Sequence, residues 1–204
     1  MSTKTIGTIP AEKLLGMEID LLTKLRSGAL SLYSFEMYLK AQNPFNFPNT
    51  IKLGTFKTEG ELRSAIEAAG GNVSDYSKGI MSKPKFTLAE TEMDVELVIT
   101  SGADLGFTEA ATRKEIYERA TLEEFGYMLC PAEVGPQLRL QYLGQPKNEW
   151  LLIAMEPIAG SGGDLVIFYV ERDDGGKLWL YTHYVSADSR WSPGSRWVFL
   201  RPRR

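Results

Sequence analysis

Apolar residues in the first 40 positions recur at the spacing of an α-helix. From Pro10 onward we predict one helix that ends near Ser27, with a stripe made of Leu14, Leu15, Met17, Ile19, Leu22 and Leu25. Ser31 can cap a second helix. Pro44 and Pro48 disfavour helix at the residues before them. We therefore predict a helical hairpin over residues 1–45, followed by a linker.

The next hundred residues mix short strands with capped helices. We expect a strand at 51–56 and another around Val95–Ile99. Thr58 and Thr112 are each followed three residues later by glutamate, which predicts two helices that begin with capping boxes, the second running to Phe125. Ser74 or Asp75 can open a further short helix. Leu138, Leu140 and Tyr142 alternate with polar residues, so Gln137 to Leu143 is expected to be a strand.

Strand patterns separated by turns fill the rest of the chain. Strands are predicted at residues 150–155, 165–171, 178–185 and 196–200, with turns at 160–163 and 173–176. We predict an α+β fold with a helical N-terminal portion, a central strand–helix–strand unit and a mainly antiparallel C-terminal sheet. Its second domain would span residues 50–204 and be β-rich from about residue 136.

Composition narrows the cellular setting. The chain has 204 residues and a single cysteine, Cys130, so it cannot form an intrachain disulfide. Residues 1–10 lack the apolar run of a signal peptide, and no stretch approaches the roughly 18 apolar residues of a membrane helix. We therefore expect a soluble, cytoplasmic protein without a membrane partner.

Charge is distributed unevenly behind a net value of −3. Residues 88–170 carry 14 acidic and 5 basic side chains, which disfavours a duplex wrapped around this part. Residues 171–204 carry 7 basic and 4 acidic side chains and end in Arg203 and Arg204. That basic end is expected to be a solvated tail, and nucleic acid remains an unfavoured partner.

Two carboxylates are the best candidates for catalysis. Glu133 and Glu156 each adjoin a predicted strand, and two carboxylates in one cleft could act as a general acid and base. Arg139 could then steady an anion. The alternative is that both glutamates are strand-end caps or partners of Arg139. A hydrolase built on these three residues is therefore one hypothesis for function.

Other reactive residues predict no site. His183 is expected at a sheet surface and Cys130 in the core, without the partners that a nucleophile needs. One histidine and one cysteine without paired spacing do not predict a metal site. The glycine-rich segment Gly160–Asp164 has neither the lysine nor the following helix of a phosphate loop, so it is expected to be a hairpin turn. We predict no cofactor.

All four tryptophans lie in the C-terminal part: Trp150, Trp179, Trp191 and Trp197. Tyr169, Tyr181 and Tyr184 accompany them. Such a cluster is either core or a stacking surface that works with arginines such as Arg196. Single-stranded nucleic-acid binding through that surface is a further hypothesis.

Three segments carry a resemblance to known proteins. They are residues 111–120 (ATRKEIYERA), residues 129–142 (LCPAEVGPQLRLQY) and residues 149–158 (EWLLIAMEPI), and the ending RWVFLRP at residues 196–202 joins them. In these segments the chain resembles a family of uncharacterised bacterial proteins over residues 50–204. The resemblance implies a free-standing bacterial protein and brings no activity, cofactor or catalytic residue.

We predict a non-enzymatic binding or interaction protein, because no catalytic constellation is evident and aromatic residues gather in the C-terminal sheet. This hypothesis expects an exposed aromatic patch. The N-terminal helices carry more apolar surface than a two-helix unit can bury, which also predicts a homodimer or protein partner there.

Overall fold

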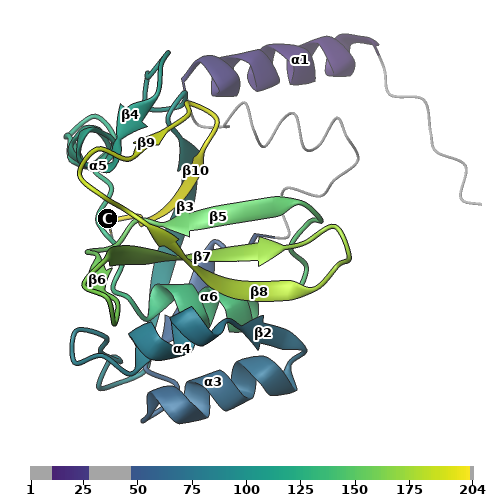
Figure 1. Cartoon of the computed structure of the whole chain (residues 1–204). Helices are drawn as coiled ribbons and strands as arrows, with labels where there is room; N and C mark the ends of the chain where they lie inside the picture. The colour runs from purple at the N-terminus through teal and green to yellow at the C-terminus, as the bar shows by residue number, and fades with distance from the viewer. Residues whose placement is uncertain (1–10, 28–46, 203–204) are drawn as a thin grey trace, which may run out of the picture. The chain divides into compact units, whose positions relative to one another are not determined.

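The chain divides into two compact units, residues 1–44 and 45–204. The computed structural model describes residues 11–27 and 47–202 (Figure 1). In the first unit, helix α1 (Ala11–Arg26) confirms the first predicted helix. The predicted helix from Ser31 lies outside the described residues.

Within residues 47–202 the structure forms an eight-stranded sheet, shown in Figure 1. Its neighbouring strands run in the order β1 (Thr50–Leu53), β3 (Met93–Ser101), β10 (Arg196–Leu200), β5 (Glu149–Ile153), β7 (Leu165–Arg172), β8 (Leu178–Tyr184) and β2 (Gly71–Val73). Strand β6 (Ile158–Ala159) also pairs with β7. A second sheet pairs β4 (Ala111–Thr112) with β9 (Arg190–Trp191).

Most strand pairs are antiparallel, and the exceptions are β10 with β5 and β2 with β8. The two predicted turns, after β6 and after β7, both connect paired strands. The predicted α+β class with a mainly antiparallel C-terminal sheet is confirmed.

Helices cover the two faces of the sheet unequally. Helices α4 (Asp75–Met81) and α6 (Val134–Gln141) lie on one side of the sheet, with α4 against β8 and α6 against β7 and β8 (Figure 1). Helix α3 (Glu59–Ala68) packs against α6 and against the edge strand β2. Helix α5 (Arg113–Thr121) covers the other face at β10, where the Tyr117 ring packs edge-on against Trp197 and Phe199. No helix of residues 47–202 packs on the second face of β5, β7 and β8.

Helix starts follow the sequence closely. Thr58 and Thr112 both form complete capping boxes, with Glu61 and Glu115 as the reciprocal partners. Ser74 caps α4 by accepting a hydrogen bond from the Ser77 amide. Helix α5 ends at Thr121, sooner than the predicted Phe125.

The predicted strand at Gln137 to Leu143 is wrong, because residues 134–141 form helix α6. Leu138 is buried as the alternation suggested. Gln137 and Arg139 are buried too, where the Gln137 amide and the two terminal nitrogens of Arg139 donate hydrogen bonds. In this segment Gln137 and Arg139, polar residues of the alternating pattern, are therefore as buried as the apolar Leu138. Pro136 is compatible with the helix because it falls in the first turn.

Candidate functional site

Glu133, the first catalytic candidate, ties three segments together from a position that is 1% exposed. Its Oε1 accepts hydrogen bonds from the Gly54 amide at 2.7 Å and from Gln137 Nε2 at 3.0 Å. Its Oε2 accepts from the Ala89 amide at 2.7 Å. Such saturation by buried donors favours a structural role for this carboxylate.

The loop at Gly54 explains why the contact with Glu133 is so close. Gly54 has a φ of +70°, and a Cβ there would lie 2.2 Å from the Thr91 carbonyl oxygen. Only glycine fits this conformation and this approach. Its amide is thereby aimed into the protein, at the carboxylate.

Arg139, the second candidate, is fully buried and bound to neutral groups. Its guanidinium donates to the Tyr142 carbonyl, to Gln145 Oε1 at 2.5 Å and to the Glu171 carbonyl at 3.3 Å. Burial lowers the pKa of Arg139 to about 10, with Arg172 contributing. The side chain connects the end of α6 to strand β7, so its contacts are structural.

Glu156, the third candidate, is exposed in the segment that follows β5. Its neighbour Met155 exchanges two backbone hydrogen bonds with the Tyr117 hydroxyl, both at 3.1 Å. Among the described residues, no hydrogen bond or ion pair joins Glu156 to Glu133 or to Arg139. The structure thus places the two carboxylates in different surroundings, one enclosed and one open to solvent.

The four tryptophans separate into a buried pair and an accessible pair. Trp191 and Trp197 belong to the core, and their ring centroids lie 5.3 Å apart. Trp150 is 38% exposed, and Trp179 is half-buried. The sequence left open whether the tryptophans are core or surface residues. Trp191 and Trp197 are core residues, and Trp150 and Trp179 are accessible at the surface.

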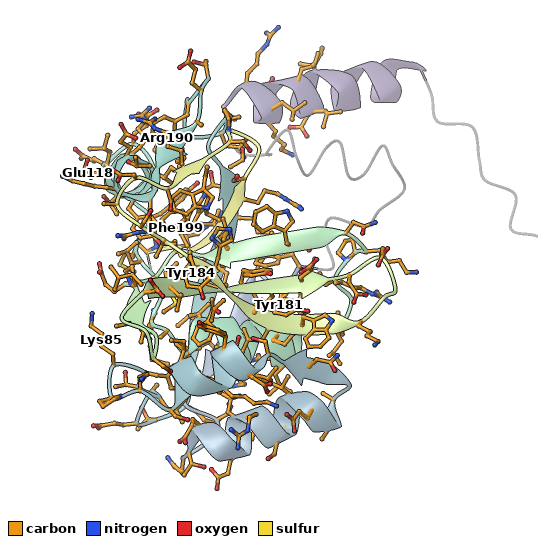
Figure 2. The ribbon with its side chains drawn as sticks, viewed as in Figure 1. Lys85, Glu118, Tyr181, Tyr184, Arg190 and Phe199 are labelled. Carbon is orange, nitrogen blue, oxygen red and sulfur yellow. The ribbon has the colours of Figure 1, made fainter. Side chains whose placement is uncertain are left out.

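The accessible pair lies on the face of β5, β7 and β8 that no helix of residues 47–202 covers. Residues that pair directly across neighbouring strands share a face. Trp150 pairs with Glu171, which pairs with Trp179, and Tyr169 pairs with Tyr181. We define the aromatic face as Trp150, Tyr169, Trp179, Tyr181 and His183, with Glu171 among them; Tyr181 can be found on β8 in Figure 2.

Ring contacts make this surface continuous. Trp179 stacks on Tyr181 with centroids 4.9 Å apart, and Tyr181 stacks on Tyr169 at 5.4 Å. Trp150 meets Tyr169 edge-on at 6.0 Å and lies nearly parallel to His183 at 6.3 Å. The rings support one another across three strands, so the surface is ordered before any partner arrives.

Two polar contacts fix the ends of the aromatic face. The Trp179 indole donates a hydrogen bond of 3.1 Å to Asp173, which lies in the turn between β7 and β8. His183 Nδ1 lies 2.8 Å from the Tyr184 carbonyl oxygen. Burial raises the pKa of Tyr169 to about 12, and Glu171 and Tyr181 add to the effect.

Arg196, which the sequence assigned to the same surface, is engaged elsewhere. It forms an ion pair with Glu149 at 3.0 Å, and both side chains are largely buried. Along β10 it alternates with Trp197, so it belongs to the face of the sheet opposite Trp197. It therefore contributes to the packing of β5 and β10 and not to the aromatic face.

Glu171, Tyr169 and Tyr181 were not among the site residues proposed from the sequence. Tyr169 and Tyr181 were noted only as neighbours of the tryptophans, and Glu171 only as the last residue of a predicted strand. A usable indication was present, because Ile167, Tyr169 and Glu171 alternate with Val166, Phe168 and Val170. The length of the turn after β7 then sets the register that brings Glu171 opposite Trp179.

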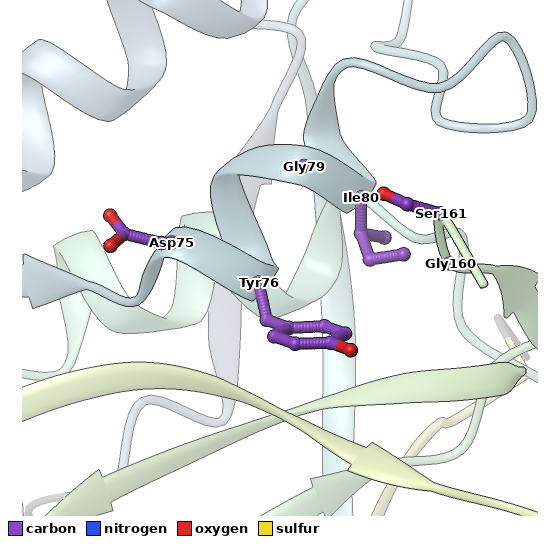
Figure 3. A pocket seen from close by; sticks show the side chains of 6 residues that line it. All are labelled: Asp75, Tyr76, Gly79, Ile80, Gly160 and Ser161. Atoms are coloured by element: carbon purple, nitrogen blue, oxygen red, sulfur yellow. The ribbon is translucent and has the colours of Figure 1, made fainter.

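A cavity of about 270 Å³ lies between α4 and the turn after β6 (Figure 3). Ile80 of α4 lies beside Ser161, and the Tyr76 ring meets Tyr184 at 6.0 Å. Its one carboxylate, Asp75, is fully exposed and pairs with Lys78. The cavity is small and its lining is mostly apolar, so we assign no reaction or ligand to it.

Neither Cys130 nor a group of metal-binding side chains forms a further candidate site in the described residues. Burial raises the pKa of the Cys130 thiol, whose Sγ donates to the Val198 carbonyl at 3.4 Å. Within the described residues, no three histidine, cysteine or acidic side chains are grouped as metal ligands would be. In the same part of the chain, no helix has the length and apolar character needed to cross a bilayer.

No family model, curated protein sequence or solved structure matches this chain. Membership of the bacterial family that the sequence resembles therefore stays a prediction. Function has to be inferred from the surfaces of the protein. Among those of residues 47–202, the aromatic face has the largest set of side chains in mutual contact.

Proposed function

We propose that this is a non-enzymatic binding protein that contacts its partner through the aromatic face. The observation that carries the proposal is the ordered row of accessible rings on a sheet face that no helix of residues 47–202 covers, with Trp150 38% exposed. Aromatic side chains supply large contact area at small entropic cost and dominate the energetics of protein interfaces.

Burial of all four tryptophans would have counted against this proposal, and only two of the four are buried. The residues suggested for hydrolysis have structural partners or stand apart, which gives the competing enzyme hypothesis little support. The single cysteine and the family resemblance favour action in the cytoplasm of a bacterium.

The four indole N–H groups offer a direct test. Two-dimensional NMR of the full chain with labelled tryptophans would be recorded during titration with peptides, oligosaccharides and single-stranded oligonucleotides. We expect a ligand that shifts the Trp150 and Trp179 signals and leaves those of Trp191 and Trp197 in place. Trp150→Ala should weaken that ligand about tenfold or more, as removal of an interface hot spot does.

Leu143→Ala is the matched control, because Leu143 is an apolar side chain that is also exposed, at 47%. It should leave binding unchanged. Ligands that bind equally well to the wild type and to Trp150→Ala would show that the aromatic face is not the binding surface.

A further inference from the structure

The aromatic face carries one carboxylate, that of Glu171, and it lies among the rings. Its residue pairs with Trp150 on one side and with Trp179 on the other. After burial, the charge of Glu171 is the largest cause that raises the pKa of Tyr169 and of Tyr181. The carboxylate therefore lies close to both tyrosine rings.

No side chain within residues 47–202 donates a hydrogen bond to the Glu171 carboxylate or forms an ion pair with it. Arg139 reaches only the backbone carbonyl of Glu171. Arg172, the next residue, donates to the carbonyl oxygens of Gly176 and Gln145. Within residues 47–202 the charge on Glu171 therefore has no hydrogen-bonded or ion-paired cation.

Neighbouring acids increase the negative charge at this end of the face. Asp173 accepts hydrogen bonds from Trp179 Nε1 at 3.1 Å and from the Lys177 amide at 2.8 Å. Asp174 is exposed in the same turn. Burial raises the pKa of the Glu171 carboxyl, and Asp173 and Asp174 raise it further. A cation would find complementary charge here, whereas a phosphate group would be repelled.

Geometry favours one kind of cation. A guanidinium is planar and weakly hydrated, stacks on aromatic rings and can bind a carboxylate with two parallel hydrogen bonds. Compact ammonium groups are more strongly hydrated, and quaternary ammonium ligands are usually enclosed by an aromatic cage. The open sheet face supplies rings and a carboxylate side by side without such an enclosure.

We propose that the aromatic face binds an arginine side chain of a partner protein, with the guanidinium paired to Glu171 and stacked against the Trp150 indole. This inference rests on the proposed binding function and names the chemistry of the partner. Glu171 is the residue that sets specificity, and the rings provide the contact area.

A set of blocked hexapeptides made of glycine, serine and two arginines, two citrullines or two lysines tests the inference. Citrulline keeps the shape of arginine and removes its charge. Binding to the full chain would be followed by tryptophan fluorescence and by the indole NMR signals. We expect the citrulline peptide to bind about tenfold more weakly than the arginine peptide, and the lysine peptide about threefold more weakly.

Glu171→Gln should weaken the arginine peptide about tenfold and leave the citrulline peptide unchanged. Glu92→Gln is the matched control, because it removes the same charge from an exposed position before β3, away from β7 and β8 in the sheet. It should not change binding.

Several results would overturn the arginine inference. The first two are a citrulline peptide or a lysine peptide that binds as tightly as the arginine peptide. The others are a Glu92→Gln variant that weakens binding as much as Glu171→Gln does, or an oligothymidine strand that binds more tightly than the arginine peptide. Equal binding of arginine and citrulline peptides that Trp150→Ala abolishes would reject the cation while leaving the proposed function intact. Peptide binding that Trp150→Ala does not affect would reject both.

Discussion

At the scale of single residues, two glutamates show how surroundings decide a carboxylate's role. Glu133 is enclosed by three hydrogen-bond donors, whereas the side chain of Glu171 has none among the described residues. A buried carboxylate with donors holds structure, and a partly buried one without them is available to an external cation. Their positions in the sequence give no hint of this difference.

Glu133→Ala should destabilise the protein by about 3 kcal/mol, because it leaves the buried amides of Gly54 and Ala89 without their acceptor. Urea unfolding followed by circular dichroism would measure the loss. Glu156→Ala, at an exposed position, should change stability by less than about 0.5 kcal/mol. Comparable stability of the two variants would reject the structural role of Glu133.

Glu171→Gln should stabilise the protein at neutral pH, although it weakens the proposed binding. The raised pKa of Glu171 means that the folded state holds this proton more tightly than the unfolded state does. The free energy of unfolding therefore falls as pH rises from the unfolded-state pKa of about 4.3 through the raised folded-state value.

The glutamine variant lacks this loss, so its advantage over the wild type should appear above that pH window and vanish below it. Thermal unfolding at acidic and neutral pH would show a rise in Tm of about 1–3 °C at neutral pH alone. An unchanged or lower Tm at neutral pH would contradict the assigned surroundings of Glu171.

At the scale of elements, the packing of α6 on β7 determines where the sheet is covered. Helix α6 approaches so closely at Gly135 that a Cβ there would lie 2.7 Å from the Cβ of Phe168. Phe168 belongs to the buried face of β7, and Tyr169 to the opposite, aromatic one. Helix α6 therefore covers the Phe168 face of β7, and the Tyr169 face does not contact this helix.

Gly135→Ala should cost about 1–3 kcal/mol of stability, because the added methyl overpacks the contact with fully buried Phe168. Gly79→Ala is the matched control within α4, where a Cβ meets nothing within 4 Å. That variant should gain about 0.5–1 kcal/mol from helix propensity. Denaturant midpoints of the two proteins would therefore move in opposite directions.

At the scale of the whole molecule, the second unit has a core of its own. Over residues 19–27 and 47–202, the buried apolar residues run from Phe47 to Phe199, all within the unit of residues 45–204. A chain shortened to residues 45–204 should thus unfold in one transition at nearly the midpoint of the same unit in the full chain. Loss of cooperative unfolding would show that residues 1–44 are needed for the core.

Self-association through the N-terminal helices stays a prediction of the sequence. Ile19 and Leu22 of α1 are exposed, at 58% and 52%. Sedimentation of the full chain at high concentration should show a dimer, and the chain of residues 45–204 should remain a monomer. A monomeric full chain would exclude these helices as a contact between copies.

The sequence predicted the local features that depend on neighbouring residues. Both capping boxes, the turns after β6 and β7 and the C-terminal strands follow from short patterns that the structure confirms. Helix α6 did not follow, because its buried Gln137 and Arg139 donate hydrogen bonds to distant groups such as Thr55 and the Glu171 carbonyl. A local pattern cannot report such partners.

By itself, then, the sequence determined the fold class, the aromatic content of the C-terminal sheet and the alternation that places rings on one side of a strand. Only the tertiary structure decided which rings are core and which are accessible, because that depends on where α5 and α6 pack. It also enclosed Glu133 among hydrogen-bond donors, whereas no side chain of residues 47–202 pairs with the Glu171 carboxylate among the rings. Both outcomes depend on contacts between segments far apart in the chain, and such contacts set burial and pairing.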